Sequence, residues 1–159
     1  MFAKHKNSAR LRDEERARLI WLLTTDKAIV STLLGKLTLA EQYDVGTLSD
    51  DIAEVGALVD HLPPPDLADT LEALPSEERH ALWRLIESEK RGYVLLEASE
   101  NVWDDLIDEM TDRELLEALQ YLDIDEQIYL VQHLPRNLTG RLLATLPPED
   151  RARGRQVMH

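Results

Sequence analysis

The sequence contains no cysteine, which excludes disulfide bonds, thiolate metal sites and a cysteine nucleophile. Aromatic residues make up only 5% of the chain, so aliphatic side chains must fill the core, and that composition favours helices over sheets. No run of about 18 apolar residues occurs, and Met1–Arg18 lacks the apolar segment of a secretory signal. These absences predict an all-α protein without a membrane-spanning segment, and its 159 residues suit a single globular body.

Sequence motifs of enzymes are also missing, since the chain has no phosphate-binding glycine loop, dinucleotide-binding fingerprint or nucleophile elbow. The five histidines are scattered without a second metal ligand at a suitable spacing. His61 and His133 each precede a Leu-Pro pair, and we expect local capping roles for them. Trp21, Trp83 and Trp103 are expected in the core or in grooves, with interface anchoring as the alternative for Trp103. We therefore expect an interaction or regulatory module and not an enzyme.

Acidic residues outnumber basic ones, and the formal net charge is −13. Residues 1–48 hold eight Lys and Arg against six Asp and Glu, whereas residues 49–148 hold seven against 23. An acidic body of this kind repels nucleic acid phosphates, so we expect no nucleic acid partner. It attracts cations or a basic protein surface.

The first 48 residues predict an N-terminal helical extension with a basic start. A helix is expected over residues 13–23, after a basic tail that frays, and a second helix over 27–34 ends at Gly35. The capping box Thr38-Leu-Ala-Glu41 could open a further short turn.

A second domain is expected over residues 49–159, after a break at Gly46-Thr47. Ser49 has the character of an N-cap for a helix that runs to about His61. The apolar residues of that helix follow helical spacing and predict its buried face: Ile52, Val55, Leu58 and Val59.

From Leu62 onwards the sequence repeats with a period of 24 residues. Four apolar series hold this period: Leu62, Ile86, Met110, Leu134 and Met158; Leu71, Leu95, Leu119 and Leu143; Leu74, Ala98, Leu122 and Leu146; and Leu82, Leu106 and Leu130. Prolines and acids punctuate each unit twice, as residues that start helices do. We therefore predict that each repeat contains two helices of about ten residues. Helices this short are not stable alone, so they must stack on one another as a solenoid or compact superhelix.

The segment from Leu62 to Arg79 resembles a family signature through Asp66-Leu67-Ala68, Leu74-Pro75 and Glu78-Arg79. It is similar to the cytosolic N-terminal domain of the MgtE family of magnesium transporters, and the resemblance extends over about residues 49–159. The resemblance implies a right-handed superhelix of short helices, followed in the full-length protein by two CBS domains and a membrane pore. It also implies that magnesium binds between the acidic N domain and the CBS domains and holds the pore closed.

The resemblance places metal-binding carboxylates on the side that faces the CBS domains. Asp125 and Glu126 match the start of a late helix in the family, but Tyr129 stands where a carboxylate is expected one turn later. Tyr93 occupies another position that is acidic in the family. The implied site is therefore incomplete, so that sensing is weaker here or other acids, such as Glu97, take part.

Helical spacing brings further acids together, because residues three or four apart share a helix face. Three pairs have this spacing: Asp104 with Asp108, Asp105 with Glu109, and Asp123 with Glu126. Magnesium needs only one or two carboxylates beside its waters. The alternative for each pair is a solvated helix face, and Asp123 could serve as a helix cap.

These observations lead to a cytoplasmic regulatory domain of a magnesium transporter as the first hypothesis. It would lie at the cytoplasmic face of the bacterial inner membrane, in a protein that is homodimeric through other domains, and would bind Mg²⁺ only weakly alone. The candidate metal ligands are Asp125, Glu126, Glu97, Asp104, Asp105 and Asp108. The alternative is an armadillo-like interaction scaffold without a metal role, similar to the helical domain of the flagellar motor switch protein.

Overall fold

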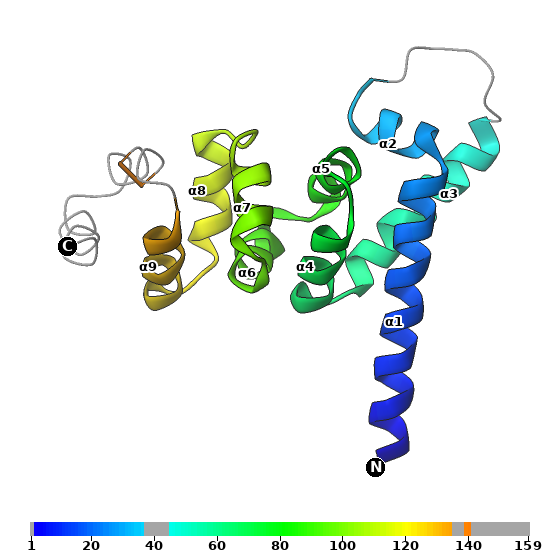
Figure 1. Ribbon diagram of the computed structural model, residues 1–159, viewed down its shortest axis with the longest axis horizontal. Coiled ribbons are helices and arrows are strands. Elements are labelled where there is room, and N and C mark those ends of the chain that lie inside the picture. The colour runs from blue at the N-terminus through cyan, green and yellow to red at the C-terminus, as the bar shows by residue number, and fades with distance from the viewer. Residues whose placement is uncertain (1, 37–44, 135–138, 141–159) are drawn as a thin grey trace. The chain divides into compact units, whose positions relative to one another are not determined.

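The computed structural model describes residues 2–36, 45–134 and 139–140, which form helices and contain no strand (Figure 1). The all-α prediction is confirmed. The chain divides into two compact units, Met1–Glu87 and Ser88–His159. The predicted boundary at residue 48 remains a prediction, and it differs in position from the division between these units. Within the described ranges, no helix combines the length and apolarity needed to cross a membrane.

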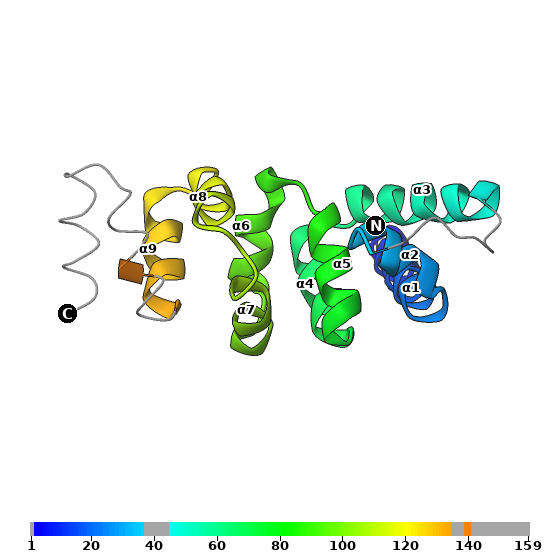
Figure 2. The same ribbon diagram turned by 90° about the horizontal axis from the view of Figure 1, so that it is seen from above.

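The first unit contains five described helices: α1 (Phe2–Thr25), α2 (Lys27–Leu33), α3 (Val45–His61), α4 (Pro64–Ala73) and α5 (Ser76–Leu85). Helix α1 packs against all four of the others, and α2 and α3 both contact α5. Figure 2 shows α1 and α2 beside α3. The core is built from aliphatic side chains of all five helices: Leu19, Leu22, Leu23, Ile29, Val55, Val59, Leu67, Leu71 and Leu82.

Three predictions for this unit are wrong. Helix α1 begins at Phe2 and not at Asp13, because nothing between these residues breaks a helix and Leu19, Leu22 and Leu23 anchor it in the core. Helix α3 runs through the predicted break at Gly46-Thr47, so Ser49 is inside the helix. A glycine in the first turn is tolerated where packing of α3 on α1 and α2 supports the helix.

The third error concerns Trp21, which is 54% exposed on α1 and lies neither in the core nor in a groove. The other two tryptophans, Trp83 and Trp103, are buried as predicted. The predicted turn at Thr38–Glu41 lies outside the described residues.

Ion pairs reinforce the docking of α1. Arg16 reaches Asp69 of α4 at 3.0 Å and Asp66 at 3.6 Å. Arg18 binds Glu54 of α3 through two hydrogen bonds of 2.9 and 3.0 Å. The Arg18 hydrogen bond lowers the pKa of Glu54 below its ordinary value. The basic side of the N-terminal segment thus neutralises acids of α3 and α4 within the same compact unit.

The second unit contains four described helices: α6 (Ser88–Glu97), α7 (Glu100–Ile107), α8 (Asp112–Gln120) and α9 (Ile124–His133). Helix α6 packs against α8 and α9. Its approach to α8 is close at Gly92, where an added Cβ would lie 2.5 Å from the carbonyl oxygen of Ala118. The core side chains of this unit are again aliphatic, with Trp103 beside them: Val94, Leu95, Val102, Leu106, Ile107, Leu115 and Leu130.

The repeat in the structure is shorter than the predicted one. Six helices begin twelve residues apart, at Pro64, Ser76, Ser88, Glu100, Asp112 and Ile124. A backbone N–H shortly after each helix bonds the carbonyl three residues earlier, at Leu74, Ile86, Ala98, Met110, Leu122 and Leu134. The predicted series that begins at Leu62 and the one that begins at Leu74 therefore alternate along the chain, and their members occupy the same position after successive helices. The predicted members Leu143, Leu146 and Met158 lie outside the described residues.

Within α4–α9, the polar side chains that link helices in pairs recur every 24 residues. Arg79 of α5 donates to the carbonyls of Leu71 and Leu74 at the end of α4, at 2.7 and 3.0 Å. Gln127 of α9 does the same for Leu119 and Leu122 at the end of α8, at 2.9 and 3.1 Å. Between them in sequence, the Trp103 indole N–H of α7 donates to the Leu95 carbonyl of α6. Each donor satisfies helix-end carbonyls that have no partner inside their own helix.

Candidate functional site

The candidate metal ligands all belong to the second unit, where they lie at the ends of helices. Glu97 is the exposed last residue of α6. Asp104 and Asp105 are in α7, exposed and half-buried respectively, and Asp108 is the exposed C-cap of that helix. Asp125 and Glu126 lie in the first turn of α9. The partial charge at a helix end affects how strongly nearby carboxylates attract a cation.

The acids of α7 lie at the helix end that favours cations. The last turn of α7 contains no basic residue, and its C-terminal carbonyls carry partial negative charge. Asp108 has helical backbone angles, φ −56° and ψ −31°, so Asp104 and Asp108 share one side of the helix, one turn apart. The negative charges of these two carboxylates add to the partial negative charge of the helix C-terminus, and a bound cation would offset the carboxylate charges and the helix-end charge.

The acids of α9 lie in its first turn, at the N-terminal end of the helix. The N-terminus of a helix already stabilises negative charge, so a cation gains less there. Asp123 accepts a hydrogen bond from the Glu126 N–H at 2.8 Å, and Glu126 accepts one from the Asp123 N–H at 3.1 Å. This capping box confirms the alternative for Asp123, a helix cap. It also occupies a carboxylate oxygen of Glu126, which leaves exposed Asp125 as the better candidate ligand in this turn.

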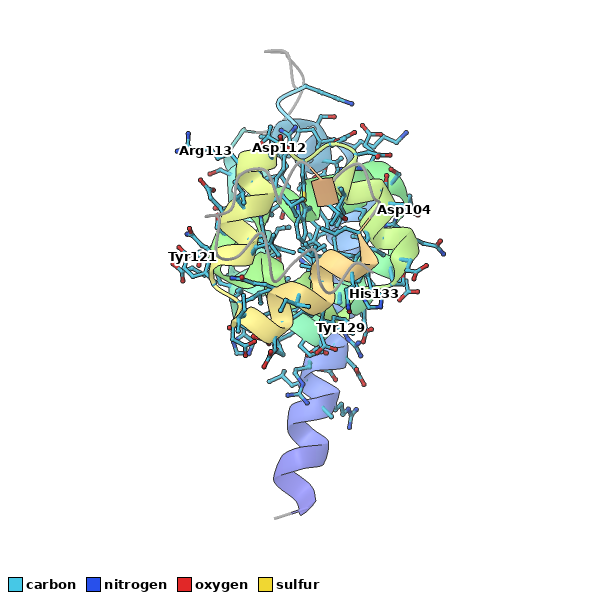
Figure 3. The ribbon with its side chains drawn as sticks, turned by 90° about the vertical axis from the view of Figure 1, so that its left-hand side faces the viewer. Asp104, Asp112, Arg113, Tyr121, Tyr129 and His133 are labelled. Carbon is cyan, nitrogen blue, oxygen red and sulfur yellow. The ribbon has the colours of Figure 1, made fainter. Side chains whose placement is uncertain are left out.

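An aromatic cluster adjoins the acids of α7. The His133 ring lies 4.4 Å from the Tyr129 ring and meets Trp103 edge-on at 5.8 Å. His133 Nδ1 is 2.7 Å from the Tyr129 carbonyl in its own helix, a local contact one turn long. In Figure 3, Asp104, His133 and Tyr129 lie toward one side of the unit, and Tyr121 and Arg113 lie toward the other. Tyr129 therefore contributes aromatic packing at the position where the family resemblance implies a carboxylate.

Tyr93 has a different environment. Its hydroxyl donates to the carbonyl of Tyr121, at 3.0 Å, and both rings are partly exposed. The contact joins α6 to the end of α8. The two tyrosines that replace expected carboxylates thus belong to separate parts of the unit.

Arg91 is a half-buried cation of α6 near the acids of α8. Desolvation lowers the pKa of Arg91, and the charges of Glu114 and Glu117 oppose that shift. Glu117 is also paired with Arg113 at 3.2 Å. The acids of α8 therefore have basic neighbours.

Three or more His, Asp or Glu side chains do not converge on a common point anywhere in the part of the chain that the structure describes. An ion on these residues would hold one or two carboxylates and complete its shell with water or a partner's oxygens, as Mg²⁺ commonly does. His61, for which we expected a capping role, has Nε2 at 3.5 Å from a carboxylate oxygen of Glu15 of α1, and the capping role remains a prediction. Sequence reasoning missed the Trp103–Tyr129–His133 cluster, because it joins residues of two helices.

Comparison with known proteins identifies a family and a similar fold. The model of the MgtE intracellular N domain matches residues 62–159. A crystal structure of the cytosolic domain of the Mg²⁺ channel MgtE in complex with ATP is similar in fold, with a TM-score of 0.57 and 20% sequence identity. The likeness covers 72% of this chain and 47% of that one, so the chain spans about half of its structural relative. No curated protein sequence matches the chain.

Proposed function

The chain belongs to the family of MgtE intracellular N domains, and from this premise we propose that it is the regulatory domain that closes a magnesium transporter when cytoplasmic Mg²⁺ is high. The match of the family model over residues 62–159 carries this proposal. The proposed location is the cytoplasmic face of the bacterial inner membrane, and the proposed partners are CBS domains of the same full-length, homodimeric protein.

The proposed mechanism is electrostatic. Two acidic surfaces repel one another, and Mg²⁺ held between them through carboxylates and water offsets that repulsion. Loss of the ion then favours the separated state, and the coupling between ion binding and docking is reciprocal. Asp104 and Asp108 are the first candidates on this chain, since the C-terminal end of α7 adds to their attraction for a cation. Asp125 is the second, and Asp105, Glu97 and Glu126 follow.

The first test is a Mg²⁺ titration of the isolated chain followed by NMR. We expect weak binding, in the millimolar range, because the partner supplies the remaining ligands, with the largest shifts at α7. A variant with Asp104→Asn and Asp108→Asn should lose those shifts. The matched control, Asp50→Asn with Glu72→Gln, removes the same charge from exposed positions of the first unit and should retain them. A single micromolar site on the isolated chain would contradict a site shared with a partner.

A second test separates the transporter from the scaffold. The reading frame beyond His159 should encode CBS motifs followed by several apolar segments long enough to span a membrane. A protein without them would favour the armadillo-like interaction scaffold, in which the acidic side chains form a solvated or partner-binding surface without a metal role.

A further inference from the structure

The outer side of α1 carries a row of exposed residues at heptad spacing. Leu11 is 52% and Trp21 54% exposed, the two highest values among the large hydrophobic residues of the described chain. Between them lie Glu14, with a side chain 63% exposed, and Arg18, with a side chain 46% exposed. Steps of three, four and three residues place all four on one seam of the helix, as in positions a and d of a coiled coil. We call these four residues the α1 seam.

The α1 seam is complementary to itself under a two-fold rotation. Leu11 and Trp21 lie five residues on either side of Arg16, and Glu14 and Arg18 lie two residues on either side. When two copies of α1 are antiparallel and centred there, Leu11 of each faces Trp21 of the other, and Glu14 faces Arg18. A parallel pair would place Glu14 against Glu14 and Arg18 against Arg18, which like-charge repulsion disfavours.

We propose that the α1 seam is the interface of a weak antiparallel homodimer of this protein. The occupant is a second copy because the same patch serves both partners, which is the condition for a closed two-fold interface. Within one chain Glu14 is 3.5 Å from Arg10 and Arg18 binds Glu54, and only the antiparallel pair adds contacts of opposite charge between Glu14 and Arg18 across the interface. The proposal is independent of the function proposed above.

The folded unit holds the seam ready for this contact. Arg18 is fixed by its two hydrogen bonds to Glu54, and its guanidinium carbon lies 4.9 Å from the centre of the Trp21 ring. Holding these long side chains in place before association reduces the entropy lost on binding. Leu19 and Leu23 anchor the helix in the core from a different face, and buried Leu22 lies at the edge of the seam, so the seam is presented on a rigid support. Figure 1 shows the N-terminal half of α1, the half that contains Leu11, projecting from the rest of its unit.

Sedimentation equilibrium of the whole chain, over a micromolar to millimolar concentration series, tests the proposal. We expect a monomer–dimer equilibrium, weak because the seam covers only about three helical turns. Trp21→Gln and Leu11→Gln should each weaken association by about tenfold or more, since each change occurs twice in the dimer. Tyr121→Ser, at an exposed aromatic residue of the second unit, is the matched control and should leave association unchanged.

A chain that stays monomeric throughout the series would overturn the proposal, as would a dimer that tolerates the seam substitutions or is lost with Tyr121→Ser. Because both seam residues are more than half exposed, their variants should unfold at the wild-type temperature, which separates lost association from lost folding.

Disulfide crosslinking tests whether the two α1 helices are antiparallel. The chain has no natural cysteine, so only introduced cysteines can form the crosslink. A Leu11→Cys chain mixed with a Trp21→Cys chain should form a mixed disulfide dimer under oxidising conditions, while the other end of the seam keeps its natural residues. Neither variant should crosslink with itself. Self-crosslinking of either variant would indicate a parallel pair, and no crosslinking in the mixture would show that the seam is not the interface.

Discussion

At the scale of residues, the recurring contact is a hydrogen bond from a side chain of one helix to the backbone carbonyls at the end of the preceding helix. Arg79 and Gln127 each donate to two carbonyls, eight and five residues earlier in the chain. Thr139 approaches the carbonyls of Val131 and Leu134 at the same offsets, at 3.4 and 3.5 Å. The residue type varies among Arg, Trp, Gln and Thr because the position requires only a donor. A repeat read from apolar residues alone does not reveal it.

Replacing Gln127 by Leu should therefore destabilise the second unit. The change keeps the size of the side chain but leaves the Leu119 and Leu122 carbonyls without these bonds, at an expected cost of about 1–3 kcal/mol. Urea unfolding measures the difference. Gln120→Leu, at an exposed position of α8, is the control and should stay within about 0.5 kcal/mol of the wild type. Equal effects of the two substitutions would rule out a capping role for Gln127.

At the scale of elements, six helices of eight to ten residues follow one another at a twelve-residue interval. Helices this short depend on packing against their neighbours. The contact between α6 and α8 is the closest example, because Gly92 allows the backbone of α8 to approach without an intervening side chain. Sequence reasoning assigned no role to Gly92, since only the partner helix shows that its missing Cβ matters.

Gly92→Ala and Gly56→Ala should have opposite effects on stability. At Gly92 the new Cβ would meet the Ala118 carbonyl oxygen at 2.5 Å and Leu122 Cγ at 2.9 Å, so we expect a loss of about 1–3 kcal/mol. At Gly56 nothing lies within 4 Å of the new Cβ, and the better helix propensity of Ala should stabilise α3 by up to about 1 kcal/mol. Thermal unfolding distinguishes the two outcomes, and a stabilised Gly92→Ala variant would show that the helices are not in close contact there.

At the scale of the whole molecule, the N-terminal segment shares a compact unit with the first helices of the repeat. Helix α1 contacts α3, α4 and α5, and its Leu19, Leu22 and Leu23 are at most 2% exposed. Its basic charge, which the sequence separates from the acidic body, pairs with acids of α3 and α4. The second unit has its own apolar core and carries all of the candidate metal ligands.

A shortened chain that begins at residue 45 should therefore lose protection in the first unit. Removal of α1 and α2 would uncover Val55, Val59 and Leu67, and each buried leucine lost from α1 contributed about 1.5–3 kcal/mol. Hydrogen exchange should show fast amides in α3–α5, with α6–α9 as the internal reference. Removing residues 1–8 alone is the control and should leave both sets protected. Undiminished protection of α3–α5 would instead support a domain boundary at residue 48.

The sequence by itself determined the helical class, the 24-residue unit of two short helices from Leu62 onwards and the acidic character of residues 49–148, because these depend on local spacing and composition. It also predicted Asp123 as a helix cap, since capping joins residues three apart. Only the tertiary structure decided that Trp21 is exposed, that Arg16 reaches Asp66 and Asp69 fifty residues away, and that Tyr93 and Tyr129 lie in different surroundings. Periodicity states which residues share a helix face, but the neighbouring helix determines what that face meets.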